Sequence, residues 1–256
     1  MRKVKPERWI VLPDIHLLEQ DHQTLLAVES YMKDHKWDGW IQLGDLLDFN
    51  EISRWTEGKP RLKKRTIKDY FDAGKEFLDR HRKIVGKKCQ MVLIQGNHEE
   101  RIENWLDSYP KFEGMLEVEN LLGLDDRNIK WIKNSSRGEK FKNGNACFIH
   151  GRYTNKYHAN KHAENYGVPV YYGHTHTVQE IARELEGEDK TIVGKSLGCL
   201  CNYKQSYLKG RPTSWQQAFA VFYFFPDGFY TEHTIRIFKH RFYAEGKMYD
   251  GVKLAS

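Results

Sequence analysis

The chain has 256 residues, 39% of them hydrophobic, and a formal net charge of +6 at pH 7. A chain of this length and composition can bury a sizeable core, and it contains no repeat, linker or low-complexity segment. No apolar stretch approaches the roughly 20 residues of a membrane span, and the basic N-terminus leads into a short strand pattern rather than a signal peptide. We therefore expect one soluble, cytoplasmic domain over residues 1–256, with no membrane contact and an oligomeric state that the sequence leaves open.

The positive charge is concentrated in residues 59–88, which contain 12 Lys or Arg against 4 Asp or Glu. A basic block of this size could bind a polyanion such as nucleic acid. The favoured interpretation is a solvated helix surface, because the water-facing sides of helices are commonly rich in lysine.

The four cysteines are Cys89, Cys147, Cys199 and Cys201. Their spacing does not match zinc knuckles, and the Cys-x-Cys pair is too tight for ordinary disulfide geometry. We expect reduced, structural thiols.

Short apolar runs alternate with helical patterns along the first two thirds of the chain. In the first part the pattern predicts strands at residues 8–13, 39–43 and 89–95, and a helix at about 21–33. Most of the basic block should form one long amphipathic helix, because its apolar residues recur at helical spacing from Ile67 to Val85. Further on, the pattern predicts helical segments from 99 to about 122, strands at 129–132 and 146–151, a helix near 158–166 and a strand at 168–173. Strands that alternate with helices imply an α/β core.

The C-terminal third has the pattern of a β-hairpin. Two apolar arms, residues 216–225 and 229–238, flank the turn sequence Pro-Asp-Gly. The second arm alternates in the way that a half-buried strand does. We therefore expect two sheets packed on each other.

Polar side chains of the kinds that bind metals follow almost every predicted strand. These residues are Asp14, His16, Asp45, Asn97, His98, His150, His174 and His176. Taken singly, each has an ordinary structural explanation, such as a helix cap, a turn or a satisfied core histidine. The carboxyl ends of strands in an α/β sheet are, however, where functional sites form. In an extended backbone, His174 and His176 would also point to the same side.

This set of side chains has a coherent metal chemistry. A mixture of Asp, Asn and His suits manganese, which we expect, and also iron, zinc, cobalt or nickel. The set exceeds the needs of one ion. Two ions about 3.5–4 Å apart, bridged by one carboxylate, can polarise a phosphoryl group and hold a hydroxide. The sequence therefore predicts a dinuclear centre for phosphoester hydrolysis.

The ordered blocks D-x-H, G-D, G-N-H-[ED], H and G-H-x-H occur between residues 14 and 176. In these blocks the chain resembles the calcineurin-like metallophosphoesterase superfamily, and more loosely its small members from bacteria and bacteriophages. The resemblance implies a two-sheet αββα sandwich with mixed sheets. It also implies one metal bound by Asp14, His16 and His176, a second bound by Asn97, His150 and His174, and Asp45 as the bridge between them.

The resemblance further implies roles in the chemical step. His98 matches the histidine that contacts the scissile phosphate and protonates the leaving oxygen, and Asp48 is our candidate for its orienting carboxylate. The second block reads GDLLDFN and lacks the phosphate-clamping arginine of protein phosphatases, so we do not expect a protein phosphatase. Arg101 could replace that arginine, or it could be a solvated helix residue.

Several substrates remain open at this point. We expect a phosphodiester or phosphomonoester of a nucleotide or nucleic acid, with a phosphodiesterase or nuclease favoured. The alternative is a metal-stabilised nucleic-acid-binding protein with little or no catalysis. A mononuclear hydrolase of the metallo-β-lactamase type is disfavoured, because no His-x-His-x-Asp-His run is present.

Two further groups of residues have less certain roles. His158 and His162 could form a third metal site, but no further ligand accompanies them, and a helix at the rim of the substrate cleft is favoured. A second group could stack on or pair with a nucleotide, or belong to the aromatic core: Tyr203, Tyr207, Lys209 and Trp215.

Overall fold

The computed structural model describes residues 5–53, 65–185, 191–204, 208 and 211–255. Six strands form the first sheet in the order β11-β10-β1-β2-β3-β4. The four strands β1 to β4 are parallel, whereas β10 runs antiparallel to β1 and pairs with β11 in a hairpin. Their bounds are Glu7–Leu12 for β1, Gly39–Gln42 for β2, Gln90–Ile94 for β3, Ile129–Ile132 for β4, Ala218–Phe224 for β10 and Tyr230–Arg236 for β11.

Five strands form the second sheet in the order β5-β6-β7-β9-β8. The central strands β6, β7 and β9 are parallel, and the two edge strands are antiparallel to their neighbours. Their bounds are Phe141–Asn143 for β5, Ala146–Phe148 for β6, Val170–Tyr172 for β7, Val178–Glu184 for β8 and Thr191–Leu197 for β9.

The two sheets pack face to face through a layer of apolar side chains. On β1, Trp9 and Val11 point into this layer, and Phe148 and Tyr171 meet them from the second sheet. The alternate residues Ile10 and Leu12 belong to a different cluster on the opposite face of the first sheet. Because successive side chains of a strand point to opposite faces, the single strand β1 contributes to both hydrophobic cores.

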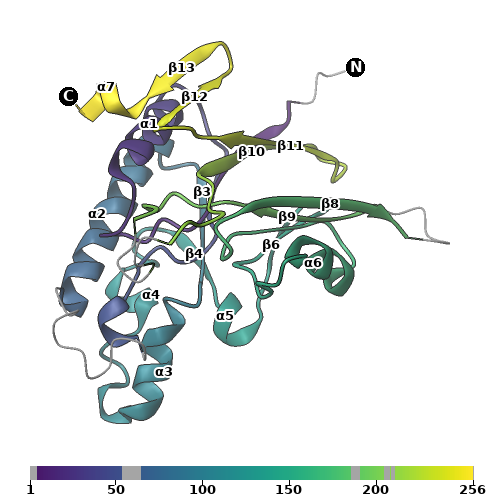
Figure 1. Ribbon diagram of the computed structural model, residues 1–256. Helices are drawn as coiled ribbons and strands as arrows, with labels where there is room; N and C mark the ends of the chain where they lie inside the picture. The colour runs from purple at the N-terminus through teal and green to yellow at the C-terminus, as the bar shows by residue number, and fades with distance from the viewer. Residues whose placement is uncertain (1–4, 54–64, 186–190, 205–207, 209–210, 256) are drawn as a thin grey trace.

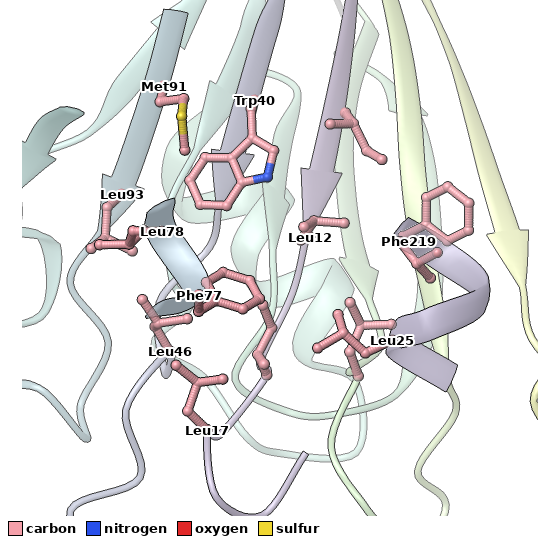
Figure 2. Close-up of a cluster of buried hydrophobic side chains, with 14 of the residues drawn as sticks. Leu12, Leu17, Leu25, Trp40, Leu46, Phe77, Leu78, Met91, Leu93 and Phe219 are labelled. Atoms are coloured by element: carbon pink, nitrogen blue, oxygen red, sulfur yellow. The ribbon is translucent and has the colours of Figure 1, made fainter. Parts of the chain in front are cut away.

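Helices cover the outer face of each sheet (Figure 1). The helices α1 (His22–Lys33), α2 (Ile67–Val85), α3 (Glu100–Ser108) and α4 (Val118–Leu121) lie on the first sheet, and α6 (His158–Tyr166) lies on the second. Figure 2 shows Phe77 and Leu78 of α2 packed beneath Trp40 of β2. A capping box between Thr66 and Asp69 fixes the start of α2.

Smaller elements complete the described chain. They are η1 (Asn50–Ile52), η3 (Pro110–Phe112), α5 (Asn134–Arg137), the hairpin of β12 (Arg241–Ala244) and β13 (Lys247–Asp250), and α7 (Gly251–Ala255). Every helix among the described residues is too short or too polar to span a bilayer.

The predicted fold class is confirmed, because two mixed sheets are packed on each other and flanked by helices. The predicted helical segment 99–122 is interrupted: α3 ends at Ser108, and Pro110 starts a short 3₁₀ turn. Proline disfavours a helical conformation in the residue before it, which explains the break. The part of the basic block at residues 59–64 lies outside the described residues.

Candidate metal centre

The predicted ligands lie at the carboxyl ends of five parallel strands. Asp14 and His16 follow β1, Asp45 follows β2 and Asn97 follows β3, all in the first sheet. From the second sheet, His150 follows β6, and His174 and His176 follow β7. The structure therefore brings all seven to the seam where the same edges of the two sheets meet.

One set of ligand atoms surrounds the facing imidazoles of His16 and His176. Their Nε2 atoms are 3.1 Å apart. Asp14 Oδ1 lies 3.4 Å from His176 Nε2, and Asp45 Oδ2 lies 3.7 Å from His16 Nε2. His16 Nδ1 lies 2.8 Å from Asp48 Oδ1 and donates to it, which leaves the lone pair on Nε2 directed at the other three atoms.

A second set surrounds His150 Nε2. Asn97 Oδ1 lies at 3.0 Å, His174 Nδ1 at 3.1 Å and Asp45 Oδ2 at 3.3 Å from this nitrogen. His150 Nδ1 lies 2.9 Å from the carbonyl oxygen of Leu43 and donates to it, so Nε2 again presents a lone pair.

Both sets fit a divalent ion. Lone pairs that face one another repel unless a cation lies between them. Ligand atoms that share a metal at about 2.0–2.2 Å are about 3–3.5 Å apart. The distances given for the second set lie in this range, and in the first set only the 3.7 Å between Asp45 Oδ2 and His16 Nε2 is longer. Asp45 Oδ2 is the atom that the two sets share.

The four histidines of the two sets differ in how strongly they hold a proton. Burial and neighbouring histidines lower the pKa of His16, and they lower the pKa of His174 to about 4. Burial lowers the pKa of His150, but Asp45 and Asp14 outweigh it and raise this pKa to about 10. For His176, burial is likewise outweighed by Asp14, and the pKa rises to about 9. Burial raises the pKa of Asp45, yet the surrounding histidines hold it well below its usual range. The negative charge of Asp14 and Asp45 that holds protons on His150 and His176 also favours metal cations.

Five of the seven predicted ligands have a left-handed backbone. The φ angles are 26° for Asp14, 51° for His16, 52° for Asp45, 63° for His174 and 57° for His176. Residues with a Cβ rarely adopt this conformation, and such strain clusters at functional sites because it aims side chains that a relaxed backbone would not.

The His-x-His segment is therefore turned and not extended, in keeping with a glycine at position 173 that lets the backbone turn tightly. His174 lies at the centre of a tight turn in which Thr175 N–H donates to the Gly173 carbonyl at 2.7 Å. The turn sends His174 to the second set and His176 to the first. Gly173 is needed for space rather than for its φ angle, because a Cβ there would lie 1.9 Å from Asp14 Oδ2.

His98, Asp48 and Arg101 form one hydrogen-bonded group beside the centre. His98 Nδ1 lies 2.8 Å from the Asp48 carbonyl oxygen and 3.1 Å from its Oδ1. His98 Nε2 lies 3.7 Å from Asp45 Oδ2. Arg101 donates to His98 Nε2 at 2.9 Å and to the Asp48 carbonyl at 2.7 Å, so it points at the centre and not into solvent.

Asp48 contacts a predicted ligand as well as His98. Its Oδ1 accepts from His16 in addition to His98, and these bonds outweigh burial and hold the pKa of Asp48 well below its usual range. The carboxylate therefore orients both imidazoles.

Glu99 is a buried site residue to which the sequence analysis gave no role. Its carboxylate accepts from the backbone N–H groups of Asp45, Leu47 and Gly96 at 3.0, 2.7 and 2.8 Å. Burial and the nearby Asp45 raise the pKa of Glu99 to about 7. Its position directly after Asn97 and His98, in the same G-N-H-E block, is the feature of the sequence that could have indicated a role.

Cys201 also lies closer to the centre than a purely structural thiol would. Its Sγ is 3.7 Å from His176 Nδ1, on the side of the ring away from the first set. Trp215 packs edge-on against the same ring with centroids 4.2 Å apart.

The remaining candidates among the described residues are held in hydrogen bonds of their own. His162 Nε2 accepts from the backbone of Arg152 and Tyr153, and His162 and His158 are both held in hydrogen bonds. Tyr203 accepts from the backbone N–H of Gln217. Tyr207 and Lys209 lie outside the described residues.

Comparison with known proteins gives low similarities. No known family model matches the chain. The Gene 54 proteins of Mycobacterium phages L5 and D29 are each 26% identical over 234 residues, which cover 84% of this chain and 88% of the relative. Two solved structures of Vps29 are similar: the zinc complex from Entamoeba histolytica (TM-score 0.45, 12% identity, 95% of this chain and 99% of that one) and the protein from Chaetomium thermophilum (0.44, 10%, 91% and 87%). The nuclease MPE of Pseudomonas putida has a TM-score of 0.36 with 16% identity, over 84% of this chain and 82% of its own. We therefore infer an activity from the geometry of the centre alone.

Proposed function

We propose that the chain is a dinuclear metal-dependent phosphoesterase of the calcineurin-like metallophosphoesterase type. The observation that carries this proposal is the sharing of Asp45 Oδ2 between two converging sets of nitrogen and oxygen ligands. A purely structural metal site would need only one such set, and here there are two that share an atom. Because the sets mix imidazole with oxygen ligands, we propose manganese as the native ion.

Two divalent ions at this place would polarise the phosphoryl group and lower the pKa of an attacking water. The chain's own residues then supply the remaining steps. His98, beside Asp45 Oδ2, is placed to donate a proton from Nε2 to the leaving oxygen, and the Asp48 carboxylate at its Nδ1 stabilises the imidazolium form. Arg101 exchanges its bond to His98 for one to a phosphate oxygen.

We favour a phosphodiester over a phosphomonoester. A diester brings a single negative charge and extends from the phosphate on two sides. Arg101 is the cation that contacts the centre in the described part of the chain, which suits the smaller charge. A cavity of about 520 Å³ opens beside His174 and offers room for one of the two ester groups.

The test is hydrolysis of bis-p-nitrophenyl phosphate and p-nitrophenyl phosphate by the manganese-loaded protein and its Asp45→Ala variant. We expect the wild type to prefer the diester and Asp45→Ala to lose roughly 10³-fold or more in kcat, because both ions are disturbed. Asp107→Ala, at an exposed aspartate on α3, is the matched control. Near wild-type turnover by Asp45→Ala at equal metal content would refute the proposal.

The same preparations test the alternative of a non-catalytic nucleic-acid-binding protein. That alternative requires salt-sensitive binding to DNA or RNA that survives metal removal, with no ester hydrolysed. In α2, cations of the basic block serve the fold: Arg80 pairs with the buried Glu29, and Arg82 donates to the Cys89 carbonyl at 2.7 Å.

A further inference from the structure

The cavity beside the metal centre has a polar wall of unusual composition. Its volume of about 520 Å³ lies in the range of small-molecule sites. His174 and Thr175 form the side next to the centre, and His158 and Thr177 continue the wall. Among the described residues that line it, none is Asp or Glu.

A chain of hydrogen bonds runs along this wall, and its direction can be assigned by counting protons. The Thr177 carbonyl can only accept, so Ser196 Oγ donates to it at 2.6 Å. With that proton in use, Thr175 donates to Ser196 at 2.9 Å, and Thr177 donates to Thr175 at 3.1 Å. His158 Nε2 then donates to Thr177 Oγ1 at 3.1 Å, and its Nδ1 accepts from the Tyr172 hydroxyl at 2.6 Å.

The assignment determines what the wall can bind. Thr175 and Thr177 are half-buried residues of the lining, and their hydroxyl protons are both committed within the chain. Their oxygens can therefore only accept hydrogen bonds from a ligand in the cavity. Gln216 offers the opposite, because its Oε1 accepts from Val178 N–H at 3.0 Å and leaves the amide NH₂ as a donor. The cavity therefore presents acceptors and a donor together.

We propose that this cavity is the subsite for the nucleoside attached to the scissile phosphate, and that Thr175, Thr177 and Gln216 recognise an edge that both donates and accepts hydrogen bonds. This inference rests on the proposed phosphoesterase function and names the substrate class of the same centre. Nucleobases have such edges, whereas a second phosphate group has acceptors alone and would find no partner on the threonine wall.

The rim of the cavity agrees with a nucleotide substrate. Lys156 is among the lining residues, and the exposed Tyr157 follows it directly in the chain. The Lys156 ammonium lies 5.2 Å from the centroid of the Tyr157 ring. A lysine with an adjacent aromatic ring is the combination that binds the phosphate and the base of a flexible strand.

The test compares two esters that share one leaving group, p-nitrophenyl thymidine 5′-phosphate and bis-p-nitrophenyl phosphate. Only the first carries a group with N–H and O–H donors. We expect the wild type to have the higher kcat/KM on the thymidine ester, although the second aryl group makes the other ester intrinsically more reactive. Thr177→Val, which removes the acceptor at nearly constant shape, should reduce this preference about five- to tenfold.

Two further variants separate recognition from general disturbance. Thr177→Ser keeps the hydroxyl and should keep the preference, and Thr191→Val, at the exposed start of β9, should behave as the wild type. An equal loss on both esters in Thr177→Val would overturn the inference and assign Thr177 a structural role. Equal kcat/KM of the wild type on the two esters would also overturn it, and this comparison does not depend on any variant folding. Failure of the wild type to hydrolyse either ester would instead refute the proposed function.

Discussion

The Glu99 carboxylate accepts a hydrogen bond of 3.0 Å from the backbone N–H of Asp45, 54 residues earlier in the chain. The same carboxylate also accepts from Gly96 N–H at 2.8 Å. It thus joins the loop after β2 to the loop after β3 at the point where both deliver metal-type ligands. The bridging aspartate is held by its backbone as well as by its neighbours.

Replacing Glu99 by Gln should therefore weaken metal binding without removing a ligand. An amide keeps the shape but can accept at only one atom, so one of the buried N–H groups loses its partner. We expect a fall of roughly 10–100-fold in metal affinity and of about 1–3 kcal/mol in the free energy of unfolding. Metal titration and denaturant unfolding measure the two effects, and Glu113→Gln at an exposed position is the control. Unchanged metal affinity in Glu99→Gln would show that the carboxylate does not position Asp45.

His98→Gln should slow the chemical step while the ions stay bound. The backbone N–H of His98 donates to Asp45 Oδ1 at 3.0 Å, but the imidazole approaches Asp45 only to 3.7 Å, and its Nδ1 is committed to Asp48. We therefore assign the imidazole to proton donation and not to coordination. A loss of roughly 10²–10⁴-fold in kcat is expected for removal of a general acid. Metal content measured beside single-turnover rates decides the assignment, since loss of an ion in this variant would make His98 a ligand.

Arg101→Lys should lower kcat/KM even though the charge is kept. The guanidinium holds His98 Nε2 and the Asp48 carbonyl with two different nitrogens, which one ammonium cannot reproduce. We expect a fall of about tenfold or more in kcat/KM for a diester. Steady-state kinetics at saturating manganese provide the measurement. A wild-type kcat/KM for Arg101→Lys would show that Arg101 does not contact the substrate.

Removal of the ions should destabilise the folded chain. Ligands that bind only the folded state stabilise it by about 2.7 kcal/mol when present at 100 times the Kd. Thermal unfolding should therefore shift upward with added manganese and back again with a chelator. Asp45→Ala should lose most of this shift, and an equal shift in that variant would place the ions elsewhere.

The stability of the chain should also fall at acid pH through His162. Burial lowers the pKa of His162 to about 4, from a usual value near 6.5, and its Nε2 accepts from two backbone N–H groups. Between about pH 6.5 and 4 the unfolded chain therefore binds a proton that the folded chain refuses. The stabilisation of the folded chain by neutral His162 is complete above pH 6.5. It is lost as the pH falls from about 6.5 to 4. The difference in unfolding free energy between the wild type and His162→Gln should shrink by about 2 kcal/mol from pH 7 to pH 4.5. A constant difference would exclude His162 as the source.

The strands that deliver the ligands could be read from the sequence because each is a short apolar run that ends in a polar block. β1, β2 and β3 are nearly or completely buried, and burial on both faces produces such runs. The edge strand β8 was not delimited, because half or fully exposed residues occupy all of it and give little apolar signal.

The contacts between the blocks could not be derived from the sequence. Asp48 pairs with His16 across 32 positions, and Glu99 reaches Asp45 across 54. Local patterns carry no information on which distant partner a buried group will find. The left-handed backbone at His174 and His176 was missed for a related reason, since it is imposed by packing at the seam and contradicts the intrinsic preference of histidine.

The position of the centre at the seam has a consequence for biosynthesis. Asp14, Asp45 and Asn97 belong to the first sheet, while His150, His174 and His176 belong to the second. A nascent chain that has emerged only as far as β4 presents three of the four residues of the first set and two of the four residues of the second. The first sheet is itself completed late, because β10 pairs with β1 across more than 200 residues of sequence. If the proposed function holds, tight loading of both ions waits until the chain has emerged beyond His176, and a product truncated before β7 lacks a ligand of each set.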